Sequence, residues 1–294
     1  MSYISAEAFP AKLLKILNFQ DKPHPIHLQF NPTNLCNLNC EFCSCKDVDR
    51  NKELSFGEIE REIKKFKELG GLSVTITGGG EPTIHGDIDR IIELMHNLGL
   101  KIGMVTNGTL LDRVKNLNLL TWCRISANNG SWRISEEIIK NIKIDWALSY
   151  VFCENTKRTQ DEVNGLIEFA NRNENITHLR IVSDIFNPIY IPKFENDRKV
   201  IYQNRQKYVR GAKKCWISMI KPVLDADGYY YPCCGTQYAK FGMSRKMHED
   251  MRMGTTISDI KEPFDGSSCD KCYYWKYNEL MEYGFKNYKH TEFV

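Results

Sequence analysis

The stretch IHLQFNPTNLCNLNCEFCSC, residues 26–45, joins a short apolar run to four closely spaced cysteines. The run at 26–31 is typical of a buried strand. The cysteines follow it at once, as Cys36, Cys40, Cys43 and Cys45. In parallel α/β folds, active sites are built on the loops at the carboxyl ends of the strands. The stretch therefore predicts a strand that carries a group of thiols to a functional edge.

Downstream, apolar runs rich in β-branched residues alternate with runs of helical periodicity. Further strands are expected at 72–77, 101–106, 122–127, 145–152 and 178–183, and helices at 55–71, 86–100, 110–117, 134–141 and 160–173. Because the strands are apolar throughout and the crossovers are helical, the sheet is expected to be parallel. Six such units fall short of the eight of a closed barrel. We expect an α/β fold, either an open six-stranded barrel or a doubly wound sheet.

Charge and cysteine content narrow the class of protein. The 294 residues include 40 Lys and Arg against 37 Asp and Glu, a net charge of +3 that does not favour nucleic acid. No apolar run is long enough to span a membrane. Residues 1–25 have helix-spaced apolar residues interrupted by lysines, which predicts a short helix rather than a signal peptide. Eleven cysteines without an export signal indicate a cytoplasmic protein whose thiols bind metal or do redox work.

The spacing of Cys36, Cys40 and Cys43 suits a metal site with three thiolates. A structural zinc site has four ligands, and Cys45 is a poor fourth because a single residue separates it from Cys43. An iron–sulfur cluster held by three cysteines leaves one iron open to an outside ligand. An open coordination position is typical of a catalytic metal site.

Together these residues resemble the radical S-adenosylmethionine (radical SAM) enzymes. Cys36, Cys40 and Cys43 match the cluster motif of that family, Phe42 matches its usual aromatic residue, and GGGEPTIH at 78–85 matches the run after the second strand. The resemblance implies a partial (β/α)6 TIM-like barrel and a 4Fe–4S cluster that receives electrons from a flavodoxin- or ferredoxin-type reductant. It also implies cleavage of S-adenosylmethionine (SAM) to a 5′-deoxyadenosyl radical, which takes a hydrogen atom from an unactivated C–H bond.

The resemblance also implies which residues bind SAM, all at the carboxyl ends of the second to fourth strands. The candidates are Gly79, Gly80, Glu81, Asn107, Ser126 and Asn128. Glu81 supplies negative charge for the amino group of SAM, and glycines let the backbone approach a ligand. In the family, polar groups after the fourth strand contact the ribose or the carboxylate. A capped turn is the alternative explanation for the last three residues.

A second group of cysteines follows at Cys215, Cys233, Cys269 and Cys272. The Asp-Gly pair at 227–228 predicts a β-hairpin that brings the first two of them together. By spacing alone, four thiolates could hold zinc or an iron–sulfur cluster. The pattern Cx12Gx4C followed by CxxC resembles the twitch form of the SPASM extension of radical SAM enzymes. That resemblance implies that these four cysteines fully ligate one auxiliary 4Fe–4S cluster, the second cluster of the chain.

Four parts are expected along the chain. They are an N-terminal helix at 1–25, a radical SAM barrel at 26–192, a basic linker helix at 193–214 and a twitch/SPASM-like domain with a C-terminal helix at 215–294. Cys123 is expected in the core. Cys153, at the end of the fifth strand, and Cys234, beside a predicted ligand, are candidate hydrogen-atom donors if the reaction inverts a stereocentre. An inert thiol is the alternative for each.

Several substrate classes remain open. An auxiliary cluster with four protein ligands has no iron for substrate, which favours electron transfer and the oxidation or epimerisation of a small polar substrate such as an amino sugar or cyclitol. A ribosomally made peptide is the alternative, although 25 residues before the first strand leave no room for a leader-binding domain. A nucleotide or nucleic acid fits the small net charge less well. A non-catalytic iron–sulfur or zinc protein would have no use for the GGGEP run.

Overall fold

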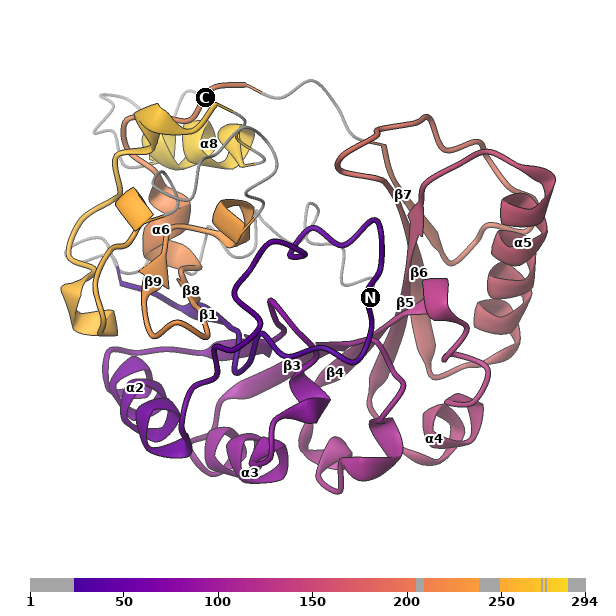
Figure 1. Cartoon of the computed structure of the whole chain (residues 1–294), viewed down its shortest axis with the longest axis horizontal. Coiled ribbons are helices and arrows are strands. Elements are labelled where there is room, and N and C mark those ends of the chain that lie inside the picture. The colour runs from indigo at the N-terminus through magenta and orange to yellow at the C-terminus, as the bar shows by residue number, and fades with distance from the viewer. Residues whose placement is uncertain (1–23, 205–208, 238–248, 271, 273, 285–294) are drawn as a thin grey trace, which may run out of the picture.

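The structure is a computed structural model that describes residues 24–204, 209–237, 249–270, 272 and 274–284. It contains a nine-stranded sheet of order β7-β6-β5-β4-β3-β2-β1-β8-β9. The sheet curves into an open barrel with its helices on the outside (Figure 1). None of the helices that the structure describes has the length and apolar composition needed to cross a bilayer.

The six predicted strands are present, parallel and adjacent in chain order, which confirms the partial barrel. They are β1 (His27–Phe30), β2 (Ser73–Ile76), β3 (Lys101–Thr106), β4 (Trp122–Ser126), β5 (Asp145–Phe152) and β6 (Ile176–Ser183). Their carboxyl ends meet at one edge, because every pair among them is parallel.

The connecting helices are α2 (Phe56–Glu68), α3 (Ile88–Asn97), α4 (Glu136–Asn141) and α5 (Lys157–Arg172). Ser55 and Glu58 form a capping box that fixes the start of α2. The helix expected at 110–117 is wrong: the chain forms two short 3-10 turns there, Leu111–Arg113 and Leu117–Leu119. Asp89 of α3 accepts hydrogen bonds from the backbone N–H groups of residues 115 and 116, which diverts them from a helical pattern.

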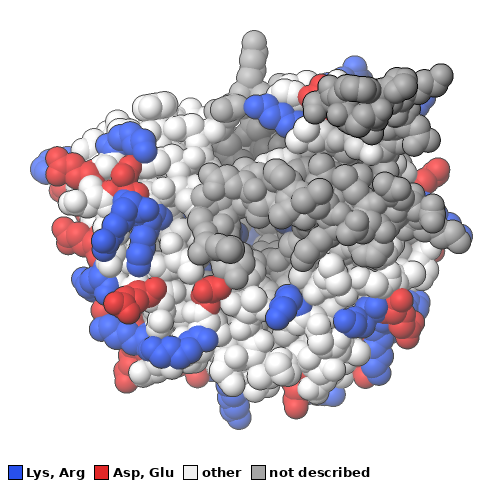
Figure 2. Space-filling model, turned by 180° about the vertical axis from the view of Figure 1, so that it is seen from behind, with Lys and Arg blue, Asp and Glu red and all other residues white. Residues whose placement is uncertain are grey.

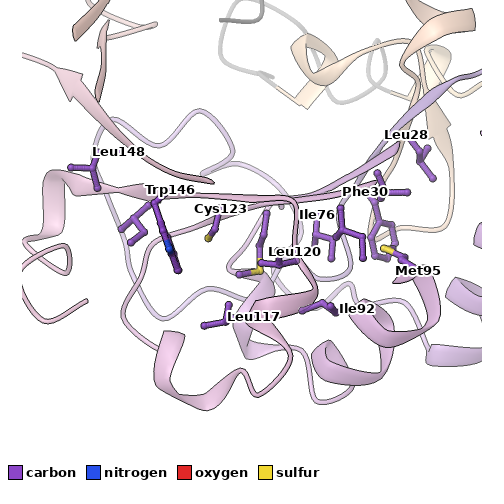
Figure 3. Close-up of a cluster of buried hydrophobic side chains, with 14 of the residues drawn as sticks. Leu28, Phe30, Ile76, Ile92, Met95, Leu117, Leu120, Cys123, Trp146 and Leu148 are labelled. Carbon is purple, nitrogen blue, oxygen red and sulfur yellow. The ribbon is translucent and has the colours of Figure 1, made fainter. Parts of the chain in front are cut away.

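The main core lies between the sheet and these outer helices. Figure 3 shows Phe30, Ile76, Cys123 and Trp146 on the face of the sheet that the helices cover. All four side chains are fully buried. Cys123 therefore packs in the core as predicted, and burial raises the pKa of its thiol. Because side chains alternate along a strand, the residues between these core positions face the inside of the barrel.

The linker helix expected at 193–214 is wrong in the described part of that segment. Strand β7 (Val200–Gln203) pairs in parallel with β6 instead. Its β-branched and aromatic residues favour an extended chain. The basic residues around this strand favoured the prediction of a solvent-exposed helix from the sequence. The helix expected at 1–25 lies almost wholly outside the described residues.

The predicted hairpin is present as β8 (Val223–Leu224) and β9 (Tyr230–Tyr231), with Gly228 at φ 84° in its turn. Strand β8 also pairs in parallel with β1, so the C-terminal region continues the barrel sheet. Helices α6 (Trp216–Ile220) and α8 (Trp275–Gly284) pack together beside the hairpin, joined by a bond from Ile217 N to Asn278 Oδ1 at 3.2 Å.

Acidic and basic side chains are interspersed on the face shown in Figure 2. The visible described surface therefore has no large region of a single charge, which agrees with the small net charge of the chain.

Candidate functional site

The first three candidate cysteines lie on the cysteine loop, residues 31–54, which joins β1 to α2. Cys43 N donates to Cys40 O at 3.1 Å and turns the loop at this point. Burial raises the pKa of the Cys40 thiol, and the thiols of Cys43 and Cys36 raise it further. The structure therefore brings Cys36, Cys40 and Cys43 within electrostatic reach of one another.

Arg50, near the end of the same loop, holds the loop to the glycine run after β2. Its Nη1 donates to Asn34 O at 3.0 Å and to Gly79 O at 2.8 Å, and its Nη2 donates to Cys45 O at 3.4 Å. Burial raises the pKa of Cys36, and the positive charge of Arg50 opposes that rise. A permanent cation beside these thiols favours the thiolate form, which is the form that binds metal.

The glycine run packs directly against the cysteine loop. A Cβ at Gly80 would collide with the backbone of Asn34 and Leu35. Gly80 N donates to Thr33 O at 3.1 Å, and Glu81 N donates to Leu35 O at 2.7 Å. The neighbour that requires a glycine at position 80 is therefore the cysteine loop itself.

Glu81 is buried, with 2% of its surface exposed, and joins the ends of β2 and β3. Its Oε1 accepts from Thr83 N at 3.1 Å, Thr83 Oγ1 at 2.7 Å and Thr106 Oγ1 at 2.6 Å. Its Oε2 accepts from Asn107 N at 2.6 Å. A carboxylate has about four lone-pair positions, shared equally by its oxygens, so Oε2 can accept one further donor. That capacity is compatible with the amino-group role expected from the sequence.

The three polar candidates after β3 and β4 differ in their contacts. Asn107 Nδ2 donates to Asn37 Oδ1 in the cysteine loop at 2.8 Å. Both polar atoms of the Asn128 side chain bond the backbone of Val151 in β5, each at 2.8 Å. Ser126 begins the turn Ala127–Asn129 without a side-chain cap bond. Asn107 and Asn128 therefore fix the loops of this edge.

A cavity of about 870 Å³ opens at the carboxyl ends of β5 and β6. Its lining includes Phe42 of the cysteine loop, Asn128, Cys153 and Asp184. Burial raises the pKa of the Cys153 thiol to about 11, with further contributions from Asp184 and other nearby carboxylates. The volume is in the range of small-molecule sites, and the cavity contains one of the two candidate hydrogen donors.

The four C-terminal candidates line one small cavity beside α6, β9 and α8. They are Cys215, Cys233, Cys269 and Cys272. Asn278 of α8 donates to the sulfur of Cys215 at 3.8 Å and to that of Cys272 at 4.0 Å. The fold thus assembles four thiols from segments far apart in the sequence.

Cys234 lies beside this group, with its Sγ 3.3 Å from Tyr274 Oη. Cys45 is buried, which raises the pKa of its thiol, and the charges of Cys43, Asp225 and Cys234 add to that rise. Cys45 and Cys234 are therefore within electrostatic reach of each other.

Within the described residues, no group of three or more His, Cys, Asp or Glu side chains is arranged to bind a single metal ion. In a 4Fe–4S cluster, by contrast, each thiolate binds a different iron atom. Thiols are the donors that iron–sulfur clusters use, and both groups of candidate cysteines offer thiols on a sheet-supported frame. The two groups of candidate cysteines therefore have the ligand type that 4Fe–4S clusters require.

Residues that join the loops were missed by the sequence analysis. Asp225 accepts from Asn31 Nδ2 at 2.7 Å in a buried position, which links the end of β1 to the hairpin. A signal for Asp225 existed, because it directly follows the apolar pair at 223–224 of a predicted strand. Arg50 and Asn37 had no comparable signal, because their partners lie in other loops.

Residues 30–149 match the family model described as "Radical SAM superfamily". The probable GTP 3′,8-cyclase of Methanothermobacter thermautotrophicus is 37% identical over 87 residues, which cover 29% of this chain and 28% of that protein. The GTP 3′,8-cyclase of Staphylococcus aureus is 35% identical over 96 residues, with the same two shares. The chain thus spans less than a third of the length of these relatives.

Two solved structures resemble most of the chain. SuiB of Streptococcus suis, bound to precursor peptide SuiA, has a TM-score of 0.57 at 15% identity, covering 94% of this chain and 68% of that one. The enzyme anSMEcpe, with bound AdoMet and Cp18Cys peptide, has a TM-score of 0.55 at 16% identity, covering 92% and 86%. At these identities the likeness concerns the fold.

Proposed function

Because the chain carries a radical SAM domain over residues 30–149, we propose that it is a radical SAM enzyme with two 4Fe–4S clusters. Cys36, Cys40 and Cys43 would hold the first cluster. When bound with SAM, this cluster would supply the electron that releases a 5′-deoxyadenosyl radical, which removes a hydrogen atom from the substrate. The observation that carries the proposal is the contact of a three-thiol loop with the Glu81 loop, clamped by Arg50.

The protein groups around that loop have distinct roles in this proposal. Glu81 would accept a hydrogen bond from the amino group of SAM at Oε2, while its other bonds keep the loops after β2 and β3 together. Ser126 offers a hydroxyl at the end of β4, and Asn107 and Asn128 hold the adjacent backbone in place. The cavity that Phe42 and Cys153 line has room for the nucleoside.

Cys215, Cys233, Cys269 and Cys272 would fully ligate the auxiliary cluster. With every iron bound to protein, that group can exchange electrons with a substrate radical but cannot bind substrate. We therefore propose oxidation or epimerisation of a small polar substrate, with an amino sugar or cyclitol as the first class to test. Cys153 and Cys234 are the candidate hydrogen donors for epimerisation, and a flavodoxin or ferredoxin is the proposed reductant.

A ribosomally made peptide is the second candidate substrate. The observation that favours it is the fold likeness over most of the chain to SuiB and anSMEcpe, both of which were solved with bound peptides. Incubating the enzyme with a deuterium-labelled aminocyclitol and, in parallel, with a panel of deuterium-labelled peptides would separate the two classes. Deuterium would pass into 5′-deoxyadenosine only from the true substrate.

The test of the whole proposal is anaerobic reconstitution with iron and sulfide, followed by SAM and dithionite. The wild-type chain is expected to bind about eight iron atoms and to release 5′-deoxyadenosine. Serine at positions 36, 40 and 43 should leave about four irons and no release. Serine at 215, 233, 269 and 272 should also leave about four irons, and the matched variant C45A should keep about eight. A fully loaded wild-type chain that releases no 5′-deoxyadenosine would refute the proposal.

A further inference from the structure

Asn278 of α8 is a buried amide that contacts two of the four C-terminal cysteines. The residue is 2% exposed and lines the same small cavity as those cysteines. Its Nδ2 donates to the sulfur atoms of Cys215 at 3.8 Å and of Cys272 at 4.0 Å. Its Oδ1 accepts from Ile217 N at 3.2 Å. One side chain therefore joins two candidate cluster ligands to the backbone of α6.

The orientation of this amide follows from its backbone partner. The N–H group of Ile217 can only donate, so the oxygen of Asn278 has to face it. The NH2 group, which has two hydrogens and cannot accept, then faces the two sulfur atoms. The opposite orientation would set two donors against each other at Ile217 and leave the sulfurs without a donor, which loses hydrogen bonds on both sides. The structure therefore directs two N–H donors at two sulfurs.

The packing of two helices sets the position of the amide. Cys215 directly precedes α6, and Cys272 lies shortly before α8. The two helices lie side by side (Figure 1). A further bond between them, from Trp216 Nε1 to Glu282 Oε2 at 2.9 Å, supports this packing. The donors therefore face the cysteines without any rearrangement of the chain.

A purely structural role for Asn278 would need only the oxygen of its side chain. The bond from Ile217 N already ties α8 to α6. In the described part of the chain, both partners of the NH2 group are sulfur atoms. A thiol sulfur is a weak acceptor, whereas an ionised group accepts bonds that are roughly twice as strong as neutral ones. The NH2 group is therefore better matched to metal-bound thiolates than to free thiols.

Hydrogen bonds to the sulfurs are among the factors that set the reduction potential of an iron–sulfur cluster. Reduction adds one negative charge to the cluster and its ligands. Donors to the sulfurs stabilise the more negative state more strongly, because the strength of such a bond grows with the charge on the acceptor. Two N–H donors should therefore raise the potential and make electron uptake easier.

We propose that Asn278 raises the reduction potential of the auxiliary cluster by donating hydrogen bonds to its ligands Cys215 and Cys272. The inference rests on the proposed function, of which that cluster is a part. Asn278 acts through the two thiolates and is therefore a positioning residue. A cluster of higher potential is a better electron acceptor, which favours oxidation of the substrate over epimerisation, because epimerisation ends with the gain of a hydrogen atom.

The test is a redox titration of the anaerobically reconstituted full chain, followed by electron paramagnetic resonance. The parent protein is C36S/C40S/C43S, in which the auxiliary cluster alone is expected to form. N278L removes both donors without adding a charge. N278D replaces the NH2 group with an oxygen and keeps an acceptor for the backbone N–H of α6. The matched controls N97L and N97D make the same changes at an exposed position at the end of α3.

We expect N278L to lower the equilibrium constant for reduction at least about tenfold, which is about 59 mV for a one-electron couple. N278D should lower it further, because it also adds a negative charge near the sulfurs. Both controls at Asn97 should have the potential of the parent. The parent and its variants should each bind about four iron atoms, the content of one 4Fe–4S cluster.

Iron content and hyperfine coupling separate the possible outcomes. Equal potentials of the parent and N278L, each with about four irons, would overturn the inference and leave Asn278 as a structural anchor. If both Asn278 variants lose iron, the parent labelled with 15N in its asparagine side chains decides. A 15N coupling to the reduced cluster would support the hydrogen bonds, and its absence would overturn them. A parent that binds no iron would instead refute the auxiliary cluster of the proposed function.

Discussion

Replacing Glu81 with glutamine tests whether this carboxylate holds the active edge together before any ligand arrives. Glutamine keeps the shape of the side chain but exchanges one oxygen for an NH2 group, which cannot accept a hydrogen bond. Three donors point at Oε1, and one, Asn107 N, points at Oε2 at 2.6 Å. In the less costly orientation the new NH2 group faces Asn107 N, so two donors oppose each other in a site that is 2% exposed.

The magnitude follows from those contacts. Loss of a hydrogen bond to a charged acceptor costs about 1.5–3 kcal/mol, and a buried donor left unsatisfied costs about 1–3 kcal/mol. We expect E81Q to lower the free energy of unfolding by about 3–5 kcal/mol. For a chain of this size, about 2 °C per kcal/mol gives a fall in Tm of about 6–10 °C. T106V removes one donor to Oε1 and should cost about 1–2 kcal/mol.

The assay is thermal unfolding of the anaerobic protein without SAM, followed by far-ultraviolet circular dichroism. The matched control is E60Q on the exposed face of α2, where the ion pair with Lys64 is worth at most about 1 kcal/mol. An E81Q variant that unfolds at the same temperature as E60Q would refute the reasoning. The carboxylate would then contribute to ligand binding alone.

Three further predictions concern groups near the site. R50M is expected to bind less iron after reconstitution than the wild type, because the guanidinium that joins Asn34 to Gly79 is lost. R50K should bind an intermediate amount, and equal iron content in the wild type and both variants would contradict this prediction. Burial raises the pKa of Cys153 to about 11. Alkylation of this thiol by iodoacetamide should therefore be slow at pH 8, and its rate should rise about tenfold per pH unit up to that pKa, as measured by peptide mass spectrometry. A rate that does not change with pH would contradict the raised pKa. The pKa of His178 is lowered from 6.5 to about 4 by burial, so its contribution to stability is present above pH 6.5 and lost as the pH falls toward 4. H178Q should therefore lose less stability than the wild type between pH 7 and pH 5 in urea unfolding, and an equal loss would contradict this.

The strands and the cysteine groupings could be predicted from the sequence because both are local patterns. Buried parallel strands are short apolar runs, and β1 to β6 lie within two residues of their expected bounds. The helix at 110–117 could not be excluded in this way, because Asp89 of another helix decides it. Similarly, β7 is a strand because β6 offers it an edge, a partner that the basic composition of 193–214 does not reveal.

The contacts that organise the site were less predictable because they join distant parts of the chain. Nothing around Arg50 indicates that it will meet the carbonyl of Gly79, since side-chain partners depend on how two loops pack. The motif predicts a ligand-binding role for Glu81. Its bonds to Thr83, Thr106 and Asn107 show a structural role that the same motif does not express. The motif therefore predicts the position of the site but not the hydrogen bonds that stabilise its loops.

The pairing of β8 with β1 ties the two separate groups of cysteines to one sheet. Strand β1 leads directly into the cysteine loop, and the β8–β9 hairpin leads to Cys233. Gln29 N donates to Pro222 O at 3.0 Å, and Asn31 N donates to Leu224 O at 2.9 Å. The buried bond from Asn31 to Asp225 adds a side-chain link at the same place. Because a sheet ladder rather than a flexible linker connects the two groups, their separation is set by the fold. A substrate held between them would then meet both at fixed positions, which is what ordered hydrogen abstraction and electron transfer require.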